Sequence, residues 1–434
     1  MMGLRSDALT VRFTRFARGG ALGAVCAQGS QALAGLALQL IAAHSLGLSG
    51  FGLFAILYGA VVLFTGVSTG FVGDSLTVLD RLDLRIRSAL QGWACILALG
   101  AGAVAIMVCA ATGMTGWWTA AAYGLAVVTF VAEDVLRRLL MAHLKFWRIV
   151  CVDMSSFLVS LAILAVSAHN GPLTLSTFFL ALGAGQFAAL FLAAGLLPRR
   201  ERFVVKPIRG GYGTVARYGA WRAAQQGLRP ALLTGMRATV GLIVGLAATG
   251  QLEAARIYAA PTMLFVSGLS SFLFASFARD TAKPLPELLR SADRMVLLLV
   301  VATIAVGGVF IGVLPWLGHL VTGHALDIWL CVGWFAYSTS IAAVTPYGAL
   351  AAVRHRQAAV FGWRLADSTF SLSLAVIALA MGGGVVLVPV ALTAGSLLGG
   401  LAIRWFILRR PFPSRPEEIA RTISPHHSQA EAHV

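Results

Sequence analysis

Charged residues are scarce in this chain of 434 residues. Only 12% of the residues are charged and 58% are hydrophobic, whereas a soluble domain carries about 25% charged and about 45–50% apolar residues. This balance excludes a disordered chain, a nucleic-acid-binding domain and an ordinary cytosolic enzyme. The net charge of +16 therefore has to be explained by where the arginines lie.

Patterns that support chemistry are also missing. The five cysteines form no CxxC pair and have no zinc spacing, so we interpret them as small buried hydrophobic residues. The histidines show no metal spacing, and no Ser/His/Asp set, nucleotide loop or pair of carboxylates stands out. We therefore expect a protein that is not an enzyme and that holds no metal and no cofactor.

Apolar runs long enough to cross a bilayer are abundant. A hydrocarbon core of about 30 Å needs about 20 apolar residues in one helix. The first run exceeds the apolar region of a signal peptide, so we expect an uncleaved helix there. The sequence predicts about twelve spanning helices, at residues 20–43, 51–72, 89–111, 116–135, 149–168, 174–197, 223–247, 252–277, 295–317, 326–351, 359–381 and 385–406.

The basic residues follow the alternation of these runs. All but three of the 33 lysines and arginines lie on one side of the predicted membrane, and the exceptions are Arg229, Arg237 and Arg256. The positive-inside rule makes that side the cytoplasm. We therefore expect a multi-pass protein of the bacterial plasma membrane with both termini in the cytoplasm.

The chain divides into two halves of six runs. We predict a cytoplasmic N-terminus (1–19), an N-terminal lobe (20–197), a cytoplasmic inter-lobe loop (198–222), a C-terminal lobe (223–406) and a disordered cytoplasmic tail (407–434). The expected fold is an all-α polytopic membrane protein with two six-helix lobes around a central cavity. Because each half has an even number of helices, the halves run parallel, as in transporters that bind substrate between lobes.

Proline is absent from the first six runs and present in the last six. Proline removes a backbone hydrogen bond and kinks a helix. The bending helices are thus expected in the second half, with Pro230 as the favoured hinge. The alternative is that proline is simply common in membrane helices.

Polar residues within the runs are candidates for function, because a charge at mid-membrane costs roughly 2.5–3.5 kcal/mol. Spacings of seven and eight residues place three arginines of the seventh run on one broad stripe. The functional interpretation is a cationic path in a water-filled cavity; the alternative for Arg222 and Arg256 is snorkelling to the headgroups. The predicted substrate-binding residues are Arg222, Arg229, Arg237, Arg256, Gln28, Gln31 and Gln225.

Two aspartates in the runs raise a second question. Arg364 and Asp367 stand at i, i+3, so an internal ion pair is favoured over substrate contact. Asp153 either pairs with an arginine of another helix or carries a proton, and pairing is favoured. Glu133 and Asp134 lie beside two arginines near a predicted helix end, where we expect them to be solvated.

Residues 15–55 read RFARGGALGAVCAQGSQALAGLALQLIAAHSLGLSGFGLFA, and residues 218–278 open the second half at the equivalent place. The first segment resembles the N-terminal repeat of bacterial polysaccharide-biosynthesis membrane proteins. These are the lipid-linked oligosaccharide (O-antigen type) flippases of the multidrug/oligosaccharidyl-lipid/polysaccharide exporter superfamily. The resemblance implies transport of a polyprenyl-(pyro)phosphate-linked glycan from the inner to the outer leaflet. Arg229 and Arg237 would then meet the phosphates, and the glycan would lie among the glutamines.

The resemblance also implies partners: the lipid-linked glycan, membrane lipids, and the glycan polymerase and glycosyltransferases of the same pathway, with no nucleic acid. Three alternatives stay open. A cation-coupled drug exporter of the same superfamily should favour acidic cavity residues. A major-facilitator transporter should carry glycines where Leu76 and Asp83 stand. A membrane-embedded glycan polymerase or ligase usually needs a large outer loop, which the short predicted outer loops do not provide.

Overall fold

The computed structural model describes residues 4–198, 201, 208, 210–279, 285–323, 325–354 and 356–409. Within these ranges the chain is helical and contains no strand. The described residues form twelve long helices, and the short helix α3 follows α2 through a π-helical segment, η1. The elements are α1 Leu4–Ser45, α2 Gly47–Ser68, η1 Thr69–Gly73, α3 Asp74–Val78, α4 Leu84–Thr112, α5 Trp117–Ala142, α6 Phe146–Asn170, α7 Leu175–Leu196, α8 Tyr212–Ile243, α9 Leu246–Arg279, α10 Leu285–Thr322, α11 Ile328–Val353, α12 Gln357–Ala380, α13 Leu387–Ala402 and η3 Ile403–Ile407.

Nine helices in the described part of the chain are long and apolar enough to cross a membrane. This supports the prediction of a multi-pass membrane protein. The long helices outside this set are α1, α8 and α9. They carry the glutamines and arginines that the sequence singled out, so the polar residues concentrate on three helices.

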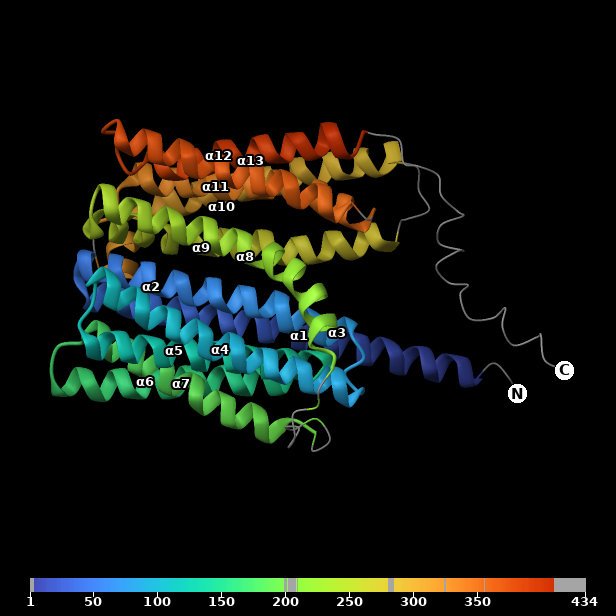
Figure 1. The fold of residues 1–434 in the computed structure, drawn as a ribbon. Helices are drawn as coiled ribbons and strands as arrows, with labels where there is room; N and C mark the ends of the chain where they lie inside the picture. The colour runs from blue at the N-terminus through green and yellow to red at the C-terminus, as the bar shows by residue number, and fades with distance from the viewer. Residues whose placement is uncertain are drawn as a thin grey trace.

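The helices form two lobes that lie side by side (Figure 1). In the first lobe α7 packs on α5 and α6, α4 packs on α5, and α1 packs on α6. The second lobe repeats this pattern: α13 packs on α11 and α12, α10 packs on α11, and α8 packs on α12. The two-lobe, all-helical fold predicted from the sequence is thus confirmed.

Helix α2 makes most of the contact between the lobes, because it packs along both α8 and α9. At one end the backbones meet directly at two glycines. A Cβ at Gly52 would collide with the carbonyl oxygen of Leu246, and a Cβ at Gly250 would collide with that of Leu48. Leu48 and Gly52 in α2 correspond to Leu246 and Gly250 in α9. Each helix therefore contributes a glycine and a leucine carbonyl oxygen, and the contact is reciprocal. We call it the Gly52–Gly250 crossing; a twofold axis along the helices produces such a contact.

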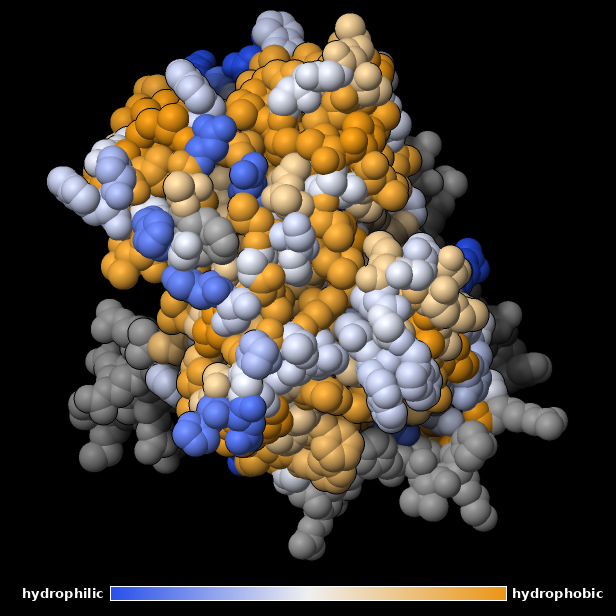
Figure 2. Space-filling view, turned by 90° about the vertical axis from the view of Figure 1, so that its left-hand side faces the viewer, coloured by the Kyte–Doolittle hydropathy of each residue, from blue (hydrophilic) through white to orange (hydrophobic). Residues whose placement is uncertain are grey.

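The turns that lead into these two helices also match. Gly47, the first residue of α2, has a φ of +65°, and Gly245, which precedes α9, has a φ of +120°. Both values lie where L residues are strained and glycine is not. The end of the bundle that carries these turns is mainly apolar and weakly polar, with scattered hydrophilic residues (Figure 2).

Helix ends differ from the predicted boundaries where the flanking sequence is polar. Helix α1 already begins at Leu4, within the predicted N-terminus 1–19, and α8 begins at Tyr212, within the predicted loop 198–222. Hydropathy finds only the part of a helix that lies in the bilayer, whereas these helices continue beyond their apolar runs. The remainder of that loop is described only at residues 198, 201, 208, 210 and 211. Most of the predicted tail, residues 410–434, lies outside the described residues.

Candidate functional site

A cavity of about 470 Å³ lies between the lobes, bounded by α1 and α2 on one side and by α8 and α9 on the other. Five of the residues predicted from the sequence line it: Gln31, Arg229, Pro230, Arg237 and Arg256. Their side chains come from α1, which is distant in sequence, and from the consecutive helices α8 and α9. We call this space the central cavity.

The most buried charged side chains beside the central cavity form a cluster of two arginines around one carboxylate. Arg237 donates from Nε to Oε2 of Glu253 at 2.9 Å, and Arg256 donates from Nε to Oε1 of Glu253 at 2.8 Å. Nη2 of Arg256 also donates to Oε1 of Gln39 at 2.9 Å. Because Arg237 and Glu253 are both buried, these bonds replace water around the charges. The cluster keeps one net positive charge.

Glu253 was missed by the sequence analysis. It stands at the start of the eighth apolar run, three residues before Arg256, and that i, i+3 spacing is the signal that identifies it. Its position also corrects the snorkelling alternative for Arg256. The guanidinium of Arg256 is held within the bundle by Glu253 and Gln39, so it does not reach for the headgroups.

Arg229 is the exception among the cavity arginines. It is exposed, and in the part of the chain that the structure describes it makes no hydrogen bond or ion pair. It lines the central cavity and also a second cavity within the C-terminal lobe. Its five N–H donors are thus available at the junction of the two spaces.

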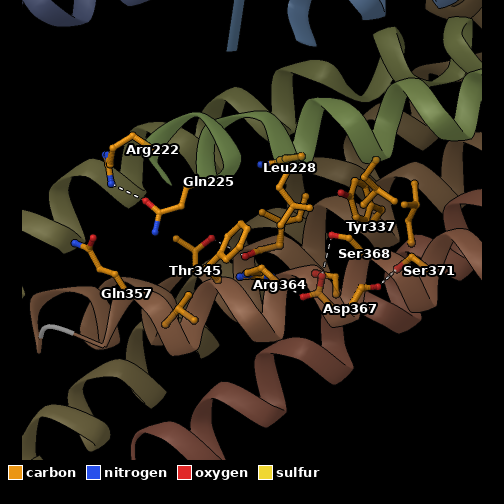
Figure 3. Close-up of a pocket in the computed structure, with 17 residues that line it drawn as sticks. Arg222, Gln225, Leu228, Tyr337, Thr345, Gln357, Arg364, Asp367, Ser368 and Ser371 are labelled. Carbon is orange, nitrogen blue, oxygen red and sulfur yellow. Dashed lines mark hydrogen bonds and ion pairs between the residues drawn. The ribbon is translucent and has the colours of Figure 1, made fainter. Parts of the chain in front are cut away.

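The second cavity has a volume of about 460 Å³ and lies among α8, α11, α12 and α13. Figure 3 shows Arg222 and Gln225 on α8 above it and Gln357, Arg364 and Asp367 on α12 below it. Nη1 of Arg364 lies 3.3 Å from Oδ2 of Asp367, which is the predicted i, i+3 ion pair. We call this space the C-lobe cavity. Its neutral hydrogen-bonding side chains are Gln225, Tyr337, Thr345, Gln357, Ser368, Ser371 and Ser396.

The remaining predicted residues, Arg222, Gln28 and Pro230, lie outside the arginine cluster of the central cavity. Arg222 pairs with Asp74 of α3 at 2.7 Å and donates to Oε1 of Gln225 at 2.8 Å. It therefore joins the lobes. Gln28 is exposed and lines neither cavity. Pro230 lies inside the continuous helix α8, and its role as a hinge stays a prediction.

The N-terminal lobe contains a buried ion pair of its own. Nε of Arg137 donates to Oδ1 of Asp153 at 3.1 Å, and Oγ of Ser30 donates to Oδ2 of the same carboxylate at 3.2 Å. Asp153 thus has the partner on another helix that the sequence favoured. The expectation that Glu133 and Asp134 are solvated is wrong, because both are buried. Helix α5 is covered on this face by η1, where Thr69 donates to Asp134 at 2.6 Å.

No group of three or more His, Cys, Asp or Glu side chains with metal-binding geometry occurs among the described residues. The charged groups of the two cavities are mainly guanidinium groups. The arrangement can hold an anion by charge-assisted hydrogen bonds at Arg229, and it can hold neutral polar groups by the amides and hydroxyls of the C-lobe cavity.

No protein-family model and no curated protein matches the sequence. Solved structures do match. An inward-facing multidrug resistance MATE family transporter of the MOP superfamily superposes with a TM-score of 0.63 and 14% identity, covering 86% of this chain and 93% of that chain.

A MOP superfamily transporter from Pyrococcus furiosus gives a TM-score of 0.61 at 12% identity, covering 90% of this chain and 95% of that one. The eukaryotic MATE transporter AtDTX14 gives 0.57 at 16% identity, covering 90% and 94%. These likenesses set aside the major-facilitator alternative for the fold. The chain has the fold of the MATE transporters of the MOP superfamily.

Proposed function

We propose that this protein is an alternating-access exporter that moves a polyprenyl-(pyro)phosphate-linked oligosaccharide, or a related polysaccharide precursor, from the inner to the outer leaflet of the bacterial plasma membrane. The observation that carries the proposal is the charge of the central cavity. Arg229, Arg237 and Arg256 line it, and the carboxylate of Glu253 pairs with Arg237 and Arg256 only. The cavity is therefore cationic and suits an anionic substrate.

Arg229 is the residue we assign to the phosphate. Its guanidinium is unpaired within the described part of the chain, and a guanidinium offers a planar set of donors that matches a phosphate. The Arg237–Glu253–Arg256 cluster lies deeper and supplies one further positive charge. An anion that moves outward also gains about 2.3 kcal/mol per charge for each 100 mV of an inside-negative potential.

The glycan and the lipid tail would occupy different surroundings. The amides and hydroxyls of the C-lobe cavity suit sugar hydroxyls, and Arg229 stands at the junction with the central cavity. Helices α1 and α8 both line the central cavity but are not among the closely packed helix pairs. A lipid tail could therefore pass between them into the bilayer while the head group stays inside.

A drug exporter of the same fold is the second candidate. The inward-facing neighbour is a multidrug resistance transporter, and the fold alone accommodates either substrate class. A cationic drug, however, needs an acidic group that is free to pair with it, and Glu253 already accepts hydrogen bonds from two arginines. The Pyrococcus furiosus transporter, described as having a binding pocket of reverse polarity that suggests a different function, is a precedent for inferring function from pocket charge.

Transport into vesicles tests the proposal. The purified protein is reconstituted, and translocation of a short-chain polyprenyl-pyrophosphate-linked oligosaccharide is compared with that of a cationic dye. We expect glycolipid translocation that Arg229→Ala abolishes and Arg229→Lys partly retains. Transport of the dye without transport of the glycolipid would favour the drug exporter. Glycolipid transport that is unchanged in Arg229→Ala would remove this arginine from the site.

A further inference from the structure

An apolar groove lies on the first lobe, away from both cavities. It is bounded by η1, α3, α4, α5 and α7 and has a volume of about 330 Å³. Its walls are mainly alanine, leucine and valine side chains, such as Leu90, Leu136 and Leu190. Cys95 and Leu99 line it and are exposed, so the groove opens to the surroundings of the helix bundle.

One end of this groove is charged. Arg81 precedes α4, Arg87 stands in its first turn, and Glu201 completes the rim. Nε of Arg81 lies 3.5 Å from Oε1 of Glu201 and makes no hydrogen bond within the described residues, whereas Oε2 of Glu201 lies 2.6 Å from Nε2 of His143. The residues that line this end thus bring two guanidinium groups and one carboxylate together, and the rim is basic.

The groove has the depth of one membrane leaflet. From Arg87 to Leu99 the wall follows α4 for twelve residues, which is about 18 Å at 1.5 Å per residue. A leaflet contributes about half of the ~30 Å hydrocarbon core. A ligand with one apolar chain of leaflet length and an anionic head thus matches the lining, the length and the charge of the groove.

We propose that this groove binds one acyl chain of an anionic glycerophospholipid, whose phosphate lies at Arg81 and Arg87. The lipid comes from the leaflet at the end of the bundle where α1 begins. Basic rims between membrane helices attract anionic headgroups, and burial of an acyl chain against leucine and alanine contributes the apolar part. The site is separate from the central cavity and does not depend on what that cavity carries.

Cys95 provides the measurement, because it lies inside the groove, and Cys151 on α6 provides an internal control, because it is exposed outside the groove. The protein in a neutral detergent is treated with N-ethylmaleimide while dioleoyl-phosphatidylglycerol or dioleoyl-phosphatidylcholine is added, and both cysteines are followed by peptide mass spectrometry. We expect phosphatidylglycerol to slow modification of Cys95 at least fivefold at concentrations where phosphatidylcholine has little effect. Modification of Cys151 should stay unchanged.

Variants separate the headgroup from the chain. Arg81→Ala combined with Arg87→Ala should remove the preference for phosphatidylglycerol, whereas Arg85→Ala, an exposed arginine outside the lining, should keep it. Ala194→Phe fills the groove from α7 and should prevent protection by either lipid. Thermal unfolding of each variant shows that it is folded.

Three results would overturn the proposal. Equal protection by both lipids would remove the headgroup site. Protection by glycerol 3-phosphate alone would show a site for a soluble phosphate. Protection by undecaprenyl phosphate but not by phosphatidylglycerol would assign the groove to a polyprenyl lipid.

Discussion

Arg222 of α8 donates from Nε to Oδ2 of Asp74 of α3 at 2.8 Å, and this ion pair joins the two lobes. Both side chains are partly exposed. The ion pair therefore favours contact between the lobes but can still break during a transport cycle. It lies at the end of the bundle where α1 begins (Figure 1). An inter-lobe ion pair at this place restrains opening of the cavities toward that end.

Asp74→Asn should therefore favour opening at this end. We expect a coupling energy of about 1 kcal/mol between Asp74 and Arg222 in a double-mutant cycle of thermal unfolding. A cysteine introduced at Leu228, which lines the C-lobe cavity, should react faster with a water-soluble maleimide in the Asp74→Asn background. Asp80→Asn is the control: this exposed aspartate lies six residues after Asp74, and its substitution should change neither the coupling energy nor the reaction rate.

The second prediction separates Arg237 from Arg229. Arg237→Ala leaves the buried carboxylate of Glu253 with one partner fewer, and removing one member of a buried ion pair costs roughly 3–5 kcal/mol. Arg229→Ala removes no contact within the described residues. We expect a marked fall of the melting temperature for Arg237→Ala. For Arg229→Ala we expect the free energy of unfolding to change by less than about 0.5 kcal/mol.

Transport should show the opposite sensitivity at matched amounts of folded protein. Arg229→Ala should lose most glycolipid translocation in spite of normal stability. If Arg237→Ala unfolded at the wild-type temperature, the cluster with Glu253 would not be the structural unit described above.

The third prediction concerns the two aspartates of the lobes. Asp153 and Arg137 are buried, whereas Arg364 of the Arg364–Asp367 pair is one-third exposed. Asp153→Asn should thus reduce the free energy of unfolding by roughly 3–5 kcal/mol and Asp367→Asn by roughly 1 kcal/mol. Denaturant titration in mixed micelles measures both. Normal stability of Asp153→Asn together with loss of pH-dependent transport would instead identify a proton carrier.

Much of this site could be predicted from the sequence, because a polar residue in an apolar run has to face something other than lipid. For this reason Gln31, Arg229, Arg237 and Arg256 could be predicted as cavity residues. Glu253 as the shared partner of two arginines and Asp74 as the partner of Arg222 could not be predicted. The Arg237–Glu253 and Arg222–Asp74 pairs each join two helices, so no local spacing encodes them; the first depends on how α8 packs on α9 and the second on how the lobes pack.

The same limit explains why the start of α8 and the burial of Glu133 and Asp134 differ from what the sequence predicts. Hydropathy marks the apolar part of α8 but not its extension back to Tyr212. Residues 133–138 resemble a solvated helix end by composition, yet Thr69 of η1 donates a hydrogen bond to Asp134 and Asp153 of α6 pairs with Arg137. A π-helical segment such as η1 has no sequence signature, and it commonly occurs at functional sites.

The fourth prediction tests the Gly52–Gly250 crossing. A methyl group at Gly52 has no space beside the carbonyl oxygen of Leu246, whereas one at Gly100 of α4 meets nothing within 4 Å. Gly52→Ala should destabilise the protein by roughly 1–3 kcal/mol through overpacking. Gly100→Ala should be neutral or stabilise the helix by about 0.5–1 kcal/mol. Thermal unfolding of both variants checks the contrast, and an equal effect of the two would contradict the close approach.

The crossing also has a mechanical consequence for how the two lobes move. At Gly52 and Gly250 the backbones abut without intervening side chains, so the lobes can pivot there with little rearrangement of rotamers. At the other end the backbones also meet closely, because a Cβ at Gly70 would collide with the carbonyl oxygen of Arg222, and there the Arg222–Asp74 ion pair adds a side-chain contact that can break and re-form. The lobes thus touch backbone to backbone at both ends of the segment formed by α2 and η1, and the cationic cavity lies between these two contacts.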